Sequence, residues 1–230
     1  MLSVSETMSW RKGITKLVSI AFAALAITAC AAEEDGGDEA DMEATADQLQ
    51  SSPLAESDMV RVRQPAGMPK PWDQPDSTGW FDERGKCGPT AVANTLKLYW
   101  IDVSPEEADR KGVHWVIGTM GRQIADYLQK YHPELGCTLE HPKDGAAFLR
   151  RELAGGHPVM VWYNTTGSLS SHWVTAVGTR GSGDAEKVVV MSWGRYYEIS
   201  MKKLVDAWRN VYGIRHPSVV CDEKTTLLSR

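Results

Sequence analysis

The chain has 230 residues, of which 42% are hydrophobic and 24% are charged; this is typical of a globular protein and too short for two full domains. The formal net charge of -5 is unevenly distributed, because residues 31–60 hold ten acidic and no basic residues, whereas residues 61–230 hold 22 basic and 19 acidic ones. The larger part is therefore near-neutral and lacks a run of lysine and arginine interleaved with aromatic residues, which argues against a nucleic acid partner.

The first 29 residues are predicted to be an export signal. Three basic residues precede an apolar run over residues 17–27, which is too short for a comfortable permanent membrane span. The run ends in Ile-Thr-Ala-Cys, which resembles the lipobox of bacterial lipoproteins. The resemblance implies acylation of Cys30 and anchoring of the exported chain to the bacterial membrane, with the outer membrane or cell surface favoured by Ala31. A plain secretory signal or an uncleaved anchor would also place the domain outside the cytoplasm.

Residues 30–60 are predicted to be a disordered acidic tether. They are rich in Glu, Asp, Ala, Gly and Ser, and so few large apolar side chains cannot offset the entropy lost on folding. Residues 61–80 contain four prolines and are expected to form an extended entry segment. The folded domain is therefore assigned to residues 61–230.

Hydrophobic residues at helical spacing, lying between capping residues, predict four helices in the first half of this domain. The first begins at Cys87, with Pro89 in its first turn. The second begins after Ser104, in a capping-box signature, and ends at Gly112. The remaining two are expected through Ile124 and Leu128, and from Asp144 to Gly155.

Short runs rich in Val, Trp and Tyr predict strands in the second half. The turn over residues 180–184 has hairpin chemistry, so the strands on either side of it should be antiparallel neighbours. Ser200 is expected to cap a short final helix. Helices followed by an antiparallel sheet indicate an α+β architecture. The predicted strands cover residues 158–163, 172–179, 187–191 and 196–199.

Cys87 and His172 are the candidate catalytic pair. A thiol at the start of a helix lies near unpaired N–H groups and the positive end of the peptide dipoles, which can pull its pKa from about 8.5 toward ~3.5–7.5. A nucleophilic cysteine also needs a base, which can be distant in sequence. His172 opens a predicted strand directly after a polar loop, where its side chain can point into a cleft.

These residues resemble a known family. The Cys87-Gly-Pro-Thr-Ala start, Gly156 and Pro158 before an apolar strand, and His172-Trp-Val in the next strand are similar to papain-like peptidases related to the bacteriocin-processing, double-glycine leader peptidases. The resemblance implies a papain-like fold, Cys87 as nucleophile and His172 as general base. It also implies a peptide or protein substrate and hydrolysis through an acyl-enzyme, with the Cys87 N–H in the oxyanion hole.

The sequence departs from the family pattern at two positions. The family glutamine that donates to the oxyanion is absent from residues 81–86, and Gln74 is the nearest candidate. The asparagine that orients the histidine is replaced by Met191, so Ser192 is the candidate partner of His172, with Trp193 shielding the pair from water.

Two other functions fit the same residues. One is a non-catalytic binding lipoprotein that has kept the fold, which the two departures favour. The other is acyl transfer by the same Cys-His pair. In each case we expect a monomer without a cofactor.

The remaining cysteines and histidines predict no metal site. The cysteines form no CxxC pair, and the histidines other than His172 lack metal-ligand spacing. Cys137 and Cys221 are candidates for a disulfide in an exported protein, and free thiols are the alternative.

Overall fold

The computed structural model describes residues 52–74, 86–113, 118–166 and 171–222. The expectations for the signal peptide, for Cys30 and for most of the acidic tether lie outside these residues. Five α-helices are described in these ranges: α1 (Cys87–Leu98), α2 (Pro105–Ala108), α3 (Gly121–Tyr131), α4 (Gly145–Ala154) and α5 (Met201–Trp208).

The main sheet has seven antiparallel strands in the order β1-β6-β5-β4-β3-β9-β2, and β7 and β8 form a separate pair. The expected α+β architecture is therefore confirmed. The strands are β1 (Val60–Val62), β2 (Cys137–Glu140), β3 (Val159–Asn164), β4 (Ser171–Arg180), β5 (Lys187–Ser192), β6 (Arg195–Ser200), β7 (Asn210–Val211), β8 (Ile214–Arg215) and β9 (Ser218–Cys221).

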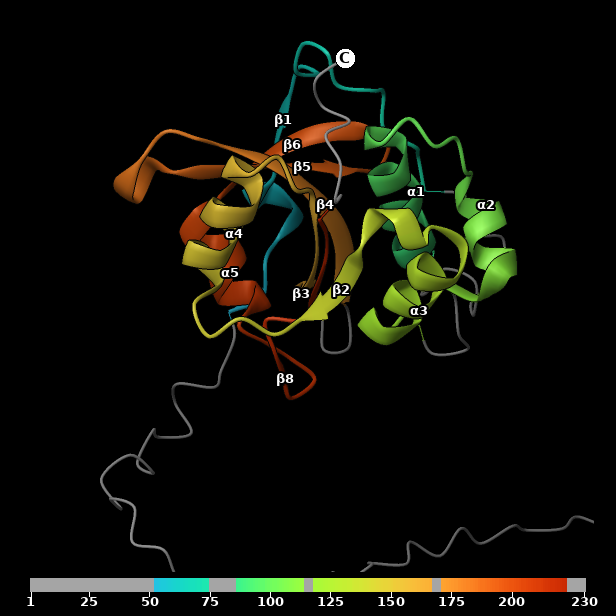
Figure 1. The fold of residues 1–230 in the computed structure, drawn as a ribbon. Coiled ribbons are helices and arrows are strands. Elements are labelled where there is room, and N and C mark those ends of the chain that lie inside the picture. Colours follow the sequence, from blue (N-terminus) through green and yellow to red (C-terminus); the bar gives the residue numbers. More distant parts are fainter. Residues whose placement is uncertain (1–51, 75–85, 114–117, 167–170, 223–230) are drawn as a thin grey trace, which may run out of the picture. The chain divides into compact units, whose positions relative to one another are not determined.

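The sheet carries helices on both faces, whereas the sequence pattern predicts a helical part followed by a sheet. Figure 1 shows α1 and α3 on one side of the strands and α4 and α5 on the other. Alternate residues of β3 face the two layers, because side chains of a strand point to opposite faces in turn. One core includes Leu96, Ile124, Leu128, Met160 and Trp173, and the other includes Leu149, Val161, Val174, Leu204 and Trp208.

The caps agree with the sequence at two helices and differ at the third. The side chain of Ser104 accepts a hydrogen bond from the Glu107 N–H, and Asp144 accepts one from the Ala147 N–H. Ser200 lies at the N-cap of α5 but makes no side-chain capping bond. The second helix ends as α2 at Ala108 and is followed by one wider helical turn over Asp109–Val113. Within this turn Gly112, the expected end of the helix, leaves the helical conformation with φ of 102°.

Residues 54–59, which fall within the predicted tether, include two side chains that pack into the core. Leu54 and Met59 are both buried. The backbone of Leu54 pairs with the end of β3, donating to the Asn164 carbonyl at 2.9 Å and accepting from the Thr166 N–H at 3.1 Å. Two apolar side chains and these hydrogen bonds are enough to hold a locally polar segment against the sheet.

Helix α1 is fixed against β4, and this contact determines where the Cys87 thiol lies. The hydroxyl of Thr175 in β4 donates to the Ala91 carbonyl at 3.0 Å and lies 3.2 Å from the hydroxyl of Thr95. At the start of α1, a Cβ on Gly88 would lie only 2.3 Å from the side chain of Thr119. Glycine is therefore required next to Cys87 for the helix to reach this position.

Candidate active site

The Cys87 thiol lies at the first residue of α1 and is buried, with 8% of the residue exposed. Burial raises the pKa of the Cys87 thiol, and the backbone N–H groups of Trp173, Gly88 and Cys87 itself lower it by less. The expectation of a lowered pKa is therefore wrong in this structure. The helix terminus favours the thiolate as predicted, but desolvation is the larger effect, so the thiol is protonated at neutral pH.

His172 is held by a side chain on the neighbouring strand β5 and by the turn after it. Its Nε2 lies 2.9 Å from Ser192 Oγ, and its ring stacks on Trp193 with centroids 4.4 Å apart. With the proton on Nε2, His172 donates to Ser192, and Nδ1 is left to accept a proton. Ser192 and Trp193 thus lie where the sequence places them, and their roles in catalysis stay predictions.

The turn between β5 and β6 explains how Trp193 reaches the imidazole. Trp193 and Gly194 are the two central residues of this turn, with φ of 43° and 67°. Two consecutive positive φ values are typical of a type I′ hairpin, in which a non-glycine first residue is strained. The strain is compatible with a functional position for Trp193, because the ring covers one face of His172.

Gln74 belongs to a short segment that is attached to both sides of the site. The Trp72 N–H donates to Asn94 Oδ1 at 2.7 Å, and the Gly194 N–H donates to the Trp72 carbonyl at 3.0 Å. Lys97 Nζ lies 4.3 Å from the centroid of the Trp72 ring. The residue two positions before Gln74 is therefore fixed to α1 and to the β5–β6 turn at once.

Cys87, His172, Ser192 and Gln74 all line one pocket, so the structure brings together the four residues predicted for catalysis. The pocket is small, with an empty volume of about 170 Å³. The other described lining residues are Thr90, Ala91, Asn94, Trp173, Met191 and Trp193.

The burial of His172 predicts acid-sensitive stability. Desolvation lowers the pKa of His172 from 6.5 to about 4, so the folded state keeps the ring neutral where the unfolded state takes up a proton. Stability should fall as the pH drops from 6.5 to 4, by about 3 kcal/mol for this one group. Urea unfolding at pH 7 and pH 4 measures the difference, and in His172→Gln that difference should shrink by the same amount. If the difference in unfolding free energy between pH 7 and pH 4 stayed the same in His172→Gln, it would not come from His172. It would then come from groups present in both proteins, such as His132 and His216, whose pKa values burial also lowers.

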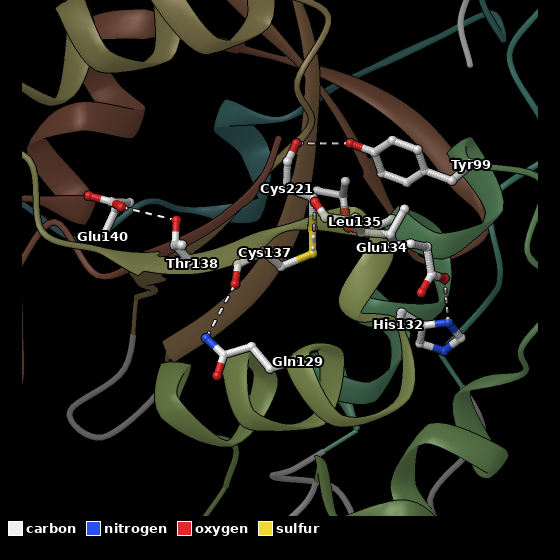
Figure 2. The surroundings of a disulfide bond; sticks show 11 residues. Tyr99, Gln129, His132, Glu134, Leu135, Cys137, Thr138, Glu140 and Cys221 are labelled. Carbon is white, nitrogen blue, oxygen red and sulfur yellow. Dashed lines mark hydrogen bonds and ion pairs between the residues drawn. A yellow bond between two sulfur atoms is a disulfide. The ribbon is translucent and has the colours of Figure 1, made fainter. Parts of the chain in front are cut away.

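Cys137 and Cys221 form a disulfide between the paired strands β2 and β9. This decides between the two alternatives that the sequence leaves open. Figure 2 shows the bond above α3, with the Tyr99 hydroxyl donating to the Cys221 carbonyl at 2.9 Å. Among the described residues Cys87 is the free cysteine. The disulfide therefore ties β9, the last strand in the sequence, to the edge strand β2.

The described residues contain no cluster of three or more potential metal ligands. None of the helices in the same ranges combines the length and the hydropathy needed to cross a membrane.

Comparison with solved structures identifies the fold. A C39-like peptidase from Bacillus anthracis matches 73% of this chain and 99% of its own, with a TM-score of 0.53 and 15% identity. The chain has the fold of a C39-like peptidase. The peptidase domain of Streptococcus ComA, a bifunctional ABC transporter of a quorum-sensing pathway, is matched at a TM-score of 0.48 and 16% identity, with 66% of this chain and 98% of that one covered. No protein-family model and no curated protein matches the sequence.

In this C39-like fold, Asn94 is the pocket residue that sequence reasoning missed. It is 1% exposed and follows Cys87 by seven residues, so two helical turns place both on one face of α1. Its Oδ1 accepts from Trp72, whereas its buried Nδ2 has no partner among the described residues. A polar residue at this spacing from the candidate nucleophile is the signal that could have identified it.

Proposed function

We propose that this protein is a cysteine peptidase or amidase that uses Cys87 as nucleophile and His172 as base. The observation that carries the proposal is a single pocket lined both by a thiol at a helix N-terminus and by an imidazole that a hydroxyl and an indole ring hold in place. The C39-like fold supports it, because a peptidase of that fold from Bacillus anthracis matches over nearly its whole length.

The reaction would begin from neutral groups. As the sulfur of Cys87 attacks the carbonyl carbon, its proton passes to His172 Nδ1 while Nε2–H donates to Ser192. The negative charge that forms on the carbonyl oxygen would be stabilised by the Cys87 N–H and by the Gln74 amide. The C–N bond then breaks, the amine leaves with the proton from His172, and water hydrolyses the thioester.

We place this activity at the cell envelope, with Cys30 acylated and the chain attached to the bacterial membrane. The apolar run of residues 17–27 and its Ile-Thr-Ala-Cys ending support this proposal.

A binding protein without catalysis is the second candidate. Met191 stands where the family has an asparagine, so His172 is oriented by a serine hydroxyl, which is a weaker acceptor than an amide carbonyl. The small volume of the pocket and the protonated thiol fit this function too.

A mass-spectrometric experiment separates these functions. The full chain is incubated with a peptide mixture and quenched with acid, and peptidase activity should leave a hydroxylamine-sensitive acyl adduct on the Cys87 peptide together with cleaved products. Cys87→Ala is the control and should show neither. Cleavage that is equal in the two proteins, or the absence of both adduct and cleavage in folded wild-type protein, would overturn the proposal. An added amine that appears in the products would indicate acyl transfer.

A further inference from the structure

An open groove of about 460 Å³ lies beside the Cys87 pocket. One side is formed by β1 and the residues after it, and the others by the Lys70–Pro71 segment and by the beginning of β6. Four of its lining residues are cationic, and none of the described ones is acidic. The four, which we call the basic groove residues, are Arg61, Arg63, Lys70 and Arg195.

The charges of the basic groove residues are not neutralised within the described parts of the chain. All four are exposed, and none of them forms an ion pair there. By contrast, Arg180 at the end of β4 and Lys187 at the start of β5 both pair with Glu198 of β6. The carboxyl group of Asp73 lies beside Gly194, at one end of the groove, and it too has no ion pair there. Four positive charges against one nearby carboxylate leave an excess of positive charge at the groove, which favours an anionic ligand.

The walls of the groove continue into the walls of the Cys87 pocket. Ser192 and Trp193 line the pocket, and the next two residues, Gly194 and Arg195, line the groove. On the other wall, Lys70 and Pro71 line the groove and Gln74 lines the pocket. A chain passing through the pocket can therefore continue into the groove.

The spacing of the arginines fits an extended peptide. Arg61 and Arg63 are two residues apart in or next to β1, so their side chains leave the same face about 7 Å apart. Side chains at alternate positions of an extended ligand have the same spacing. A recessed groove of this kind suits a single extended chain better than a lipid surface or a duplex nucleic acid.

We infer that this groove binds acidic side chains at alternate positions of an extended peptide, and, on the strength of the proposed function, that this peptide is the substrate cleaved at Cys87. Aspartate or glutamate residues a few positions from the scissile bond would pair with the basic groove residues. The groove thus assigns a substrate class to the site, namely peptides with an acidic stretch beside the cleaved bond.

Binding is tested without chemistry, in the full chain carrying Cys87→Ala. Fluorescence anisotropy compares a labelled peptide that has glutamates at alternate positions with the same peptide in which these glutamates are replaced by glutamines. Each peptide is made in two forms, with the substituted stretch before or after the central bond. We expect about tenfold tighter binding of the acidic peptide in one placement, because two or three partly exposed ion pairs are each worth a few-fold. The preference should disappear at high salt.

The triple variant Arg61→Gln, Arg63→Gln, Arg195→Gln should lose this preference, and Lys202→Gln is the matched control. Lys202 is an exposed cation on α5 that pairs with Asp206 and lies outside the groove. Equal affinities for the acidic and glutamine peptides in both placements would overturn the inference, as would an equal loss in Lys202→Gln. The inference would also be overturned if a DNA oligonucleotide or anionic vesicles bound more tightly than the acidic peptide and if the triple variant no longer bound them.

Cleavage by the protein with Cys87 intact separates this inference from the proposed function. Cleavage of both peptides with equal kcat/KM would uphold the peptidase and overturn the acidic preference. Charge-dependent binding without cleavage would uphold the groove as a peptide site and overturn the peptidase.

Discussion

Replacing His172 with glutamine should reduce kcat for peptide hydrolysis by about 10²–10⁴-fold with little change in KM, because a positioned general base contributes a factor of this size. Glutamine can still hydrogen-bond to Ser192 Oγ, which lies 2.9 Å from the imidazole, but it cannot take the thiol proton. Steady-state kinetics on a peptide that the wild-type protein cleaves measure the effect.

Two further variants sharpen this measurement. Ser192→Ala removes the acceptor of the Nε2 proton but keeps the base, so its loss in kcat should be smaller, about tenfold. His141→Gln is the control, because His141 is exposed, lies outside the pocket and contacts the Arg215 carbonyl. A kcat for His172→Gln equal to that of His141→Gln would mean that another group removes the proton.

Removing the disulfide should cost about 4 kcal/mol of unfolding free energy. The bond joins Cys137 to Cys221 across a sequence separation of 84 residues, and closing a loop of that length removes much of the entropy of the unfolded chain. Both cysteines are buried and lie opposite each other in strands β2 and β9, so the double variant Cys137→Ala, Cys221→Ala keeps the strand pairing but loses the constraint. Urea unfolding of the two proteins gives the difference.

Reduction provides the control for the substitution itself. The wild-type protein in reductant should behave like the double variant, and the double variant should not respond to reductant. Superimposable unfolding curves of the wild-type protein with and without reductant would show that the bond contributes nothing to stability. Because the pocket thiol Cys87 takes no part in the bond, Cys87→Ala should keep the full response to reductant.

Local patterns predicted much of the helical part and the antiparallel pairing of β4 with β5. The cap of α4 is an example, since Asp144 accepts from an N–H only three residues away. The position of Cys87 at the start of α1 also follows from its neighbours in the chain. The four-residue strand β9 could not be found in this way, because its hydrogen bonds are made with β2 and β3, which begin some 80 and 60 residues earlier.

Sequence alone therefore identified the candidate residues of the site: a thiol beginning a helix, a histidine opening a strand, and a serine and a tryptophan at the following turn. Only the tertiary structure decided their states and surroundings. It buries Cys87 and His172, which reverses the predicted shift in the pKa of the thiol, and it gathers four cations from three segments into one groove. The physical reason is that hydrogen-bonded caps and helical spacing act between residues close in the chain, whereas desolvation and charge clustering depend on what packs alongside.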